Sequence, residues 1–259
     1  MILRRLGNKK MIAQKIIKHF PLHSIYVEPF FGAGGMFFSK KKAKFNIVND
    51  LDNDVFNLFQ VVMNNKTEFE KLFYEMPIHS ELLNYWKQNE ETEPIKKALR
   101  FIFISLFMPF GHQGTIDLNP ENAKNNFFKM LDKTHELLFN VKFSNLDFEK
   151  FIIPTAKRII SSGADINDAF FYNDPPYVGT TDNYSNSFTK DDHCRLLDVN
   201  LETGSKFAIS EFDNDFVLSE AEKRGLNVQI IGERHNLKNK RTEILITNYK
   251  LERTLFDCL

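Results

Sequence analysis

The chain of 259 residues and 30.3 kDa has the length of one α/β domain, or of one domain that carries a substantial insertion. Hydrophobic residues make up 42% and charged residues 26% of the chain, a composition that excludes an intrinsically disordered protein. The 34 Lys and Arg balance the 34 Asp and Glu, so net charge does not drive binding to nucleic acid, and any basic surface must be local.

Helices alternate with strands over the first 64 residues. Apolar side chains at helical spacing predict the helices, and short apolar runs bounded by turn residues predict the strands. In chain order, the predicted elements are a helix at 8–19 with Asn8 as its cap, a strand at 24–30, a helix that opens at 36–42, a strand at 45–49 and a helix at 52–64.

Residues 67–140 are mostly helical and amphipathic, with a loop rich in Gly, Asn and Pro at 109–120. Further strands are predicted at 141–144, 169–173, 206–210, 227–231 and 243–248. Strands that alternate with helices predict βαβ units and a mostly parallel sheet. We therefore expect an α/β domain built from residues 1–60 and 141–259, with residues 61–140 inserted as a helical subdomain.

Charge is uneven along the chain. Residues 1–44 hold ten Lys or Arg and one acid, residues 46–94 hold ten acids and three Lys, and residues 232–254 are basic again. The two basic segments are candidates for a stripe that follows the phosphates of a nucleic acid. Solvated faces whose signs happen to cluster are the alternative interpretation.

A glycine-rich turn follows the first predicted strand, in the sequence Glu28-Pro29-Phe30-Phe31-Gly32-Ala33-Gly34-Gly35. Glycine lets the backbone approach a ligand closely, and the start of a helix offers free N–H groups to a negative group. The turn is neither a GxGxxG fingerprint nor a P-loop. A ligand site and a plain tight turn are both consistent with this sequence alone.

Asp50 ends the next predicted strand. An acid at this place accepts hydrogen bonds from the two ribose hydroxyls of a bound nucleotide. The alternative is a helix cap, since Asp50, Asp52 and Asp54 all suit the start of a helix. The spacing from the glycine-rich turn favours the ligand interpretation.

The sequence Asn173-Asp174-Pro175-Pro176-Tyr177 directly follows a buried strand. The two prolines make the turn rigid, and ligands of open α/β folds bind at the carboxyl ends of strands. Asp174 and the Pro175 carbonyl suit the two hydrogens of an exocyclic amine, and Tyr177 suits stacking on a planar heterocycle. A plain structural turn rarely combines these groups.

In these motifs the chain resembles the DNA adenine-N6 methyltransferases of the Dam family. The family's Asp-Pro-Pro-Tyr motif corresponds to residues 174–177, and its Phe-x-Gly-x-Gly motif to Phe30, Gly32 and Gly34. Further matches, in family order, are Gly7-Asn8-Lys9, Asp50, Asn145-Leu146-Asp147-Phe148, Tyr184 and the segment Arg241–Tyr249, which resembles the family's last strand. The matches cover both ends and the middle of the chain, so jointly they are specific.

The resemblance implies a Rossmann-like methyltransferase sheet, mostly parallel with an antiparallel last strand, and a helical DNA-recognition subdomain at 61–140. It implies methyl transfer from S-adenosylmethionine to N6 of an adenine that is flipped out of double-stranded DNA. The resemblance implies that Asp174, Pro175 and Tyr177 are the catalytic residues. The implied cofactor-binding residues are Lys9, Glu28, Phe30, Gly32, Gly34, Asp50, Asp147, Phe148, Asp174 and Tyr184. A cognate restriction endonuclease is a candidate partner. The expected location is the cytoplasm, for a protein encoded by a bacterium or a phage.

Two other classes of function stay open at this point. The first is a methyltransferase that acts on RNA or on another amine, such as cytosine N4. Enzymes that methylate cytosine N4 usually have Ser at the position of Asp174. A catalytically silent DNA-binding relative is the other, and the intact motifs argue against it. The stretch 110–126 lacks the Arg with which GATC-reading relatives read bases, so GATC is not expected. There, His112 and Gln113 are candidates for base contacts, and a plain loop is the alternative.

The sequence departs from the family at two further positions. Arg5 stands where relatives often carry an aromatic residue, and Glu28 stands where Asp is common, which keeps the charge. The seven His and two Cys show no metal-binding spacing. The two cysteines, Cys194 and Cys258, are too few for a disulfide scaffold, which indicates a reducing compartment. We expect His193 to lie at the surface or to cap a helix.

Overall fold

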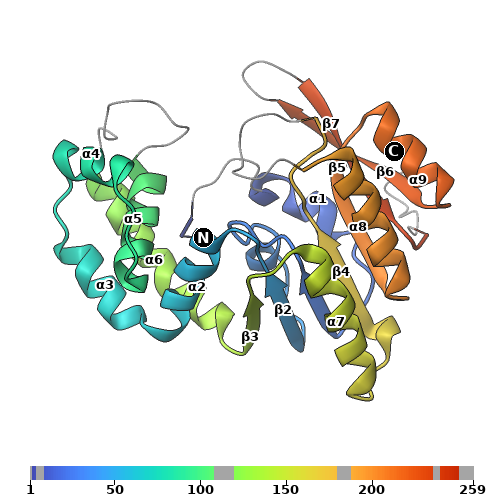
Figure 1. Ribbon diagram of the computed structural model, residues 1–259, viewed down its shortest axis with the longest axis horizontal. Helices are drawn as coiled ribbons and strands as arrows, with labels where there is room; N and C mark the ends of the chain where they lie inside the picture. Colours follow the sequence, from blue (N-terminus) through green and yellow to red (C-terminus); the bar gives the residue numbers. More distant parts are fainter. Residues whose placement is uncertain (1, 4–8, 108–119, 180–187, 236–239, 251–259) are drawn as a thin grey trace.

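The computed structural model describes residues 2–3, 9–107, 120–179, 188–235 and 240–250 (Figure 1). Its centre is a seven-stranded sheet in the order β3-β2-β1-β4-β5-β7-β6. The strands are β1 Ile25–Glu28, β2 Phe45–Asn49, β3 Val141–Ser144, β4 Ala169–Asn173, β5 Lys206–Phe212, β6 Asn227–His235 and β7 Lys240–Thr247. Strand β7 runs antiparallel to β5 and β6, and the other neighbours pair in parallel. The predicted α/β class with a mostly parallel sheet is confirmed.

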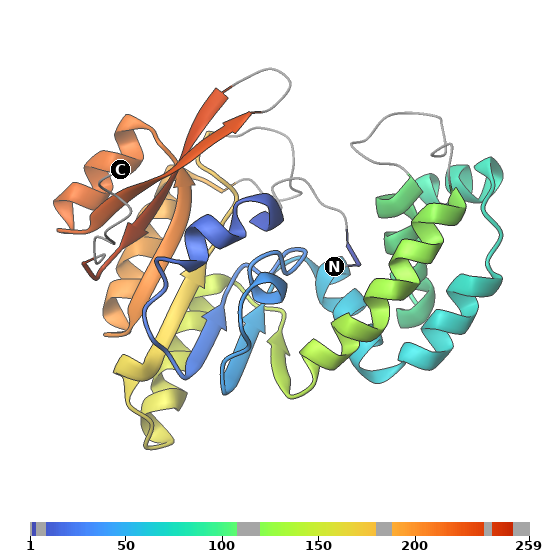
Figure 2. The same ribbon diagram turned by 180° about the vertical axis from the view of Figure 1, so that it is seen from behind.

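Helices cover both faces of the sheet (Figures 1 and 2). One face packs against α7 Phe148–Ser161, α8 Lys190–Glu202 and α9 Asp215–Lys223. The other face packs against α1 Ala13–Ile17. Each face of the sheet has its own hydrophobic core, and alternate residues of β1 point into the two cores. Ile25 and Val27 face α7 and α8, whereas Tyr26 faces α1. Both faces are covered, so the central strands are almost wholly apolar.

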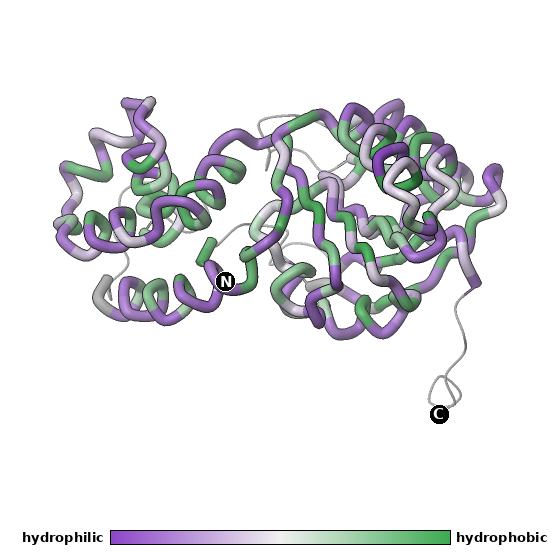
Figure 3. Tube along the Cα trace, turned by 90° about the horizontal axis from the view of Figure 1, so that it is seen from below, coloured by the Kyte–Doolittle hydropathy of each residue, from purple (hydrophilic) through white to green (hydrophobic). Residues whose placement is uncertain are grey.

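In the described part of the chain between β2 and β3, five α-helices lie beyond the β3 edge of the sheet (Figure 2). They are α2 Asn53–Asn64, α3 Lys66–Glu75, α4 Ser80–Gln88, α5 Pro94–Phe107 and α6 Pro120–Leu138. Hydrophobic and hydrophilic residues alternate along these helices (Figure 3), and their apolar sides merge with the core of the sheet face next to α1. Trp86 is buried in this core, whereas Tyr85 on the same helix is 55% exposed.

Two predicted helices of the N-terminal region are shorter than expected. The helix at 8–19 is a 3₁₀ turn, Lys9–Met11, followed by the five residues of α1, because this turn directs the Lys9 side chain into the protein interior. The helix at 36–42 is a 3₁₀ turn at Phe37–Ser39 that ends where Lys40 becomes extended. Among the described residues, no helix is long and apolar enough to cross a membrane.

Candidate active site at the carboxyl edge of the sheet

The predicted motifs meet at the carboxyl ends of three neighbouring strands (Figure 1). Glu28 ends β1, Asn49 ends β2 and Asn173 ends β4, with β1 between the other two. The chain order reverses between β1 and β4, since the strands on one side run β1, β2, β3 and on the other β4, β5. Open α/β sheets bind their ligands at such a point, because the connections on the two sides diverge and leave a crevice.

The glycine-rich turn has the backbone that its sequence predicts. Gly32 and Gly34 have φ angles of +52° and +72°, in the left-handed region. A Cβ on Gly34 would lie 2.4 Å from the ring of Phe38, so no larger residue fits there without movement. A Cβ on Gly32 would meet no heavy atom within 4 Å. Gly32 therefore leaves open space beside the end of β1.

Asp50 connects this turn to the next helix. Its Oδ2 accepts a hydrogen bond from the Gly32 N–H at 2.5 Å, and its Oδ1 accepts one from the Asp52 N–H at 2.8 Å. The N-cap of α2 is Asp52, which accepts from the N–H groups of Asp54 and Val55. The helix-cap alternative therefore applies to Asp52. Asp50 remains partly exposed at the sheet edge, where it can accept further hydrogen bonds.

Two asparagines, whose structural role the sequence did not predict, link the ends of neighbouring strands by hydrogen bonds. The Asn145 amide donates to the carbonyls of Asp50 and Leu51 at 2.7 and 3.0 Å. The Asn49 amide donates to the carbonyls of Pro29 and Leu146 at 3.0 and 2.9 Å. Both asparagines end or follow a strand, which is the sequence signal that marks them. Two apolar side chains next to these carbonyls are exposed, Leu51 by 50% and Leu146 by 44%.

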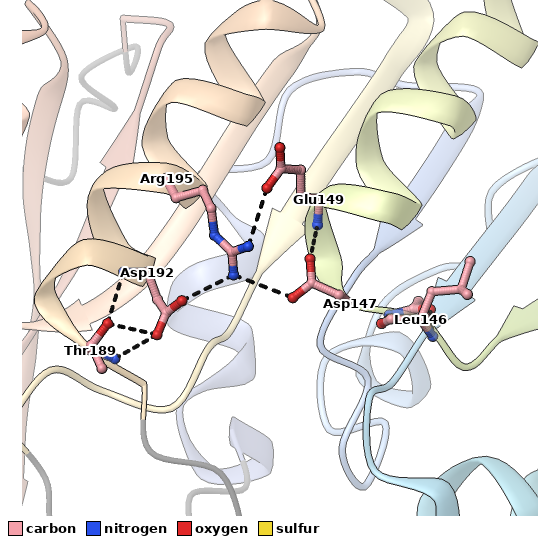
Figure 4. A network of polar contacts seen from close by, with 7 residues as sticks. Leu146, Asp147, Glu149, Thr189, Asp192 and Arg195 are labelled. Atoms are coloured by element: carbon pink, nitrogen blue, oxygen red, sulfur yellow. Dashed lines mark hydrogen bonds and ion pairs between the residues drawn. The ribbon is translucent and has the colours of Figure 1, made fainter.

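Asp147 lies at the start of α7 and faces Arg195 of α8 (Figure 4), and Phe148 is the first residue of that helix. Asp147 caps the helix by accepting the Glu149 N–H, and it pairs with Arg195 of α8 at 3.3 Å. Phe148 packs against Phe30, with ring centroids 5.6 Å apart, and the Arg195 guanidinium lies 4.4 Å from the Phe148 ring centroid. The predicted Phe30, Asp147 and Phe148 therefore lie together, held by an arginine that the sequence did not reveal.

The Asp174 carboxylate lies beside a buried lysine. The Lys9 ammonium is 2.5 Å from Asp174 Oδ1, 3.5 Å from Glu243 Oε1 and 4.4 Å from the centroid of the Tyr177 ring. Only 2% of Lys9 is exposed, against 19% of the Asp174 side chain. A buried lysine with these neighbours is an internal counterion for the motif. Pro175 is buried next to it, and within the described part of the chain its carbonyl accepts no hydrogen bond.

Tyr177 is buried and anchored at its hydroxyl. The hydroxyl donates to Glu243 Oε1 at 2.5 Å, and the ring lies edge-on to Phe212 with centroids 4.5 Å apart. Burial is the main reason that the pKa of Tyr177 is raised well above its usual value, and the neighbouring carboxylates of Asp174 and Glu243 add to it. The phenol is thus a neutral donor at physiological pH. Stacking of Tyr177 on an adenine stays a prediction.

Glu28 lies inside the protein rather than on its surface. Only 2% of the residue is exposed, and the Tyr26 hydroxyl donates to its Oε2 at 2.8 Å. Burial raises the pKa of Glu28 to about 8, so the carboxyl is uncharged at neutral pH. Its predicted contact with a cofactor stays untested by this geometry.

The expectation for His193 was wrong. His193 lies on α8 and is completely buried, because its position in the helix faces the sheet rather than solvent. Its Nδ1 is 3.9 Å from Glu211 Oε2 of β5, and among the described residues neither ring nitrogen has a hydrogen-bond partner. Tyr184, His112 and Gln113 lie outside the described residues.

The sheet order and the crevice edge define a Rossmann-like α/β fold with an antiparallel last strand. The sequence model of the D12 class N6 adenine-specific DNA methyltransferases matches residues 6–242, and the chain belongs to this family. Its reaction is methyl transfer to N6 of adenine in DNA, and family and fold imply S-adenosylmethionine as the cofactor.

Several relatives carry the name DNA adenine methylase. The protein of Vibrio cholerae is 25% identical over 223 residues, which cover 80% of this chain and 78% of that protein. The Escherichia coli K12 protein is 26% identical over 215 residues, which cover 76% and 74%. Among solved structures, an rRNA methyltransferase of Streptomyces viridochromogenes aligns with 91% of this chain and 82% of its own at 12% identity and a TM-score of 0.39, too distant a similarity to add to the argument.

Proposed function

We propose that Asp174 is the residue around which methyl transfer to adenine N6 is organised. One observation carries this proposal: Asp174 lies at the point where strand order reverses, and the buried Lys9 ammonium contacts only one of its two oxygens. Among the described residues, Asp174 Oδ2 has no hydrogen-bond partner. A carboxylate that is held on one side and open on the other suits a single amine donor.

The residues around the glycine-rich turn fit S-adenosylmethionine. Gly32 leaves open space, Asp50 offers carboxylate oxygens for ribose hydroxyls, and the exposed Leu51 and Leu146 offer apolar contact. Phe30 and Phe148 would close the site on the side of α7, and Asp147 would present its carboxylate from there. Gly34 keeps the turn in its open shape. When bound, this cofactor supplies a methyl group on an already activated sulfonium.

The protein must orient a weak nucleophile, because the lone pair of adenine N6 is delocalised into the ring. Asp174 Oδ2 and the Pro175 carbonyl would accept the two amine hydrogens, which favours a tetrahedral nitrogen and aims its lone pair. Lys9 fixes the position of the carboxylate, and Tyr177 is fixed by Glu243. Lys9 therefore acts in the adenine pocket in this proposal rather than as a direct cofactor ligand.

The adenine must leave the helix to reach these groups, so base flipping from double-stranded DNA is part of the proposal. Tyr177 would stack on the flipped base, since the hydroxyl bond to Glu243 holds the plane of its ring. The helices of residues 61–140 would contact the DNA target, with a recognition sequence other than GATC. A cognate restriction endonuclease is a candidate partner.

Incorporation of labelled methyl groups tests this function directly. Purified protein is incubated with methyl-labelled S-adenosylmethionine and with duplex DNA, single-stranded DNA, RNA or no nucleic acid. We expect label in duplex DNA and, after hydrolysis to nucleosides, in N6-methyladenine. Label in RNA alone or in cytosine would contradict the proposal, and label that persists at the parental rate in Asp174→Ala would contradict the role of Asp174.

A further inference from the structure

Two buried carboxyl groups hold consecutive residues of the motif loop. Glu243 of β7 accepts the Tyr177 hydroxyl, and Glu211 of β5 accepts the backbone N–H of Val178 at 3.2 Å. Glu243 pairs with Phe212 across the two antiparallel strands, so it lies on the face opposite to that of Glu211. The two side chains therefore reach the loop from opposite faces of the sheet.

Glu211 is the more completely enclosed of the two. None of it is exposed, and its Oε1 accepts the Phe212 N–H at 2.8 Å while Oε2 accepts Val178. His193 approaches from α8, with Nδ1 3.9 Å from Oε2. Burial raises the pKa of Glu211 to about 8, although the hydrogen bonds from the Phe212 and Val178 N–H groups and the Lys9 charge act in the opposite direction. Burial lowers the pKa of His193 to about 4, so His193 is neutral as well. At neutral pH the Glu211 carboxyl is therefore mostly protonated and His193 is neutral.

We propose that Glu211 is a positioning residue for methyl transfer: its buried carboxyl accepts the Val178 N–H and thereby fixes the loop that carries Asp174 and Tyr177. The residue touches neither of those side chains in the described contacts, so it acts through the backbone. Ionisation would add a negative charge near Glu243, which together with Asp174 contacts the Lys9 ammonium. This inference rests on the proposed role of Asp174.

The test is methyl transfer to duplex DNA at saturating cofactor, measured with the full chain between about pH 6 and about pH 9.5. Glu211→Gln keeps one uncharged acceptor, which can serve the Val178 N–H although not the Phe212 N–H as well, so it should retain a large part of the parental kcat at neutral pH. Above about pH 8 the parental kcat should fall as Glu211 ionises, and the Gln variant should lack that fall. Glu211→Leu removes the acceptor and should lose about tenfold to 100-fold in kcat, with the dissociation constant of S-adenosylmethionine unchanged.

Glu220→Gln is the matched control. Glu220 is also a buried acid of this domain, but it pairs with Lys223 and Arg224 and makes no hydrogen bond to the motif loop in the described contacts. It should change thermal stability and leave the parental pH profile intact. If Glu211 had only a structural role, Glu211→Gln would likewise change thermal stability and leave the parental pH profile intact.

Three results would overturn the inference. They are an alkaline fall in Glu211→Gln equal to the parental one, a parental profile that stays flat to about pH 9.5, and a folded Glu211→Leu with parental kcat. If Glu211→Leu does not fold, the pH profile of Glu211→Gln decides. A parental protein that methylates no DNA refutes the proposed function instead, so the two failures are distinguishable.

Discussion

Replacing Lys9 by methionine removes an ammonium group from a buried cluster and leaves its carboxylate neighbours in place. Lys9 is 2% exposed, and its ammonium lies 2.5 Å from Asp174 and 3.5 Å from Glu243, which is 1% exposed. Methionine has a similar length and no charge, so the change isolates the electrostatic contribution from the packing contribution.

The magnitude follows from what remains buried. Removing one partner of a buried ion pair costs about 3–5 kcal/mol, because the other charge stays uncompensated. The Asp174 side chain is 19% exposed, so water screens part of this cost, and the lower end, about 3 kcal/mol, applies. In a domain of this size each kcal/mol lowers the Tm by about 2–4 °C, which gives a fall of about 6–12 °C. The loss of a fixed Asp174 should also lower kcat by about 100-fold to 1000-fold.

Differential scanning calorimetry and single-turnover methyl transfer measure the two effects. Lys10→Met is the control, since Lys10 is the next residue and is exposed; its Tm should stay within about 1 °C of the parental value. A Lys9→Met protein with unchanged Tm and kcat would refute the view that Lys9 is the counterion of the motif. A lowered Tm with unchanged kcat would refute only its role in catalysis.

Three further changes test other parts of the site. Asp174→Ala should lower kcat by at least about 100-fold to 1000-fold while calorimetric titration shows a nearly unchanged affinity for S-adenosylmethionine. Asp50→Ala should instead weaken that affinity, since hydrogen bonds to a charged acceptor contribute about 1.5–3 kcal/mol each; unchanged affinity would leave Asp50 a purely structural role. DNA affinity should fall with salt at a log–log slope of roughly −4 to −5, if about five phosphates are neutralised. A triple alanine variant of the C-terminal basic segment should flatten that slope without changing the preferred sequence; the residues are Lys238, Lys240 and Arg241.

The strands of this protein were predictable because their apolar runs are bounded by polar turns. The predicted 45–49, 141–144 and 169–173 coincide with β2, β3 and β4. The short N-terminal helix was harder, because the inward turn of Lys9 depends on Asp174, which lies 165 residues further on. Periodicity along one segment does not contain such a contact.

In the candidate site, too, local motifs were predictable and residues that act through long-range contacts were not. Asp174, Asp50 and the glycine-rich turn are local motifs, and the fold brings them to the same sheet edge. The residues that hold them, such as Glu211, Glu243 and Arg195, come from β5, β7 and α8. Which face of a strand such a residue occupies depends on strand pairing, and a shift of one residue reverses it. Their roles therefore required the structure.

The central claim is tested most directly by mapping methylated bases in DNA from a methylation-deficient host that expresses this chain. Sequencing that detects modified adenine should find N6-methyladenine in one recurrent sequence context other than GATC, and the Asp174→Ala variant should abolish it. Absence of methylated adenine in a host that holds the folded parental protein would contradict the account, as would an equal level of methylation with the variant.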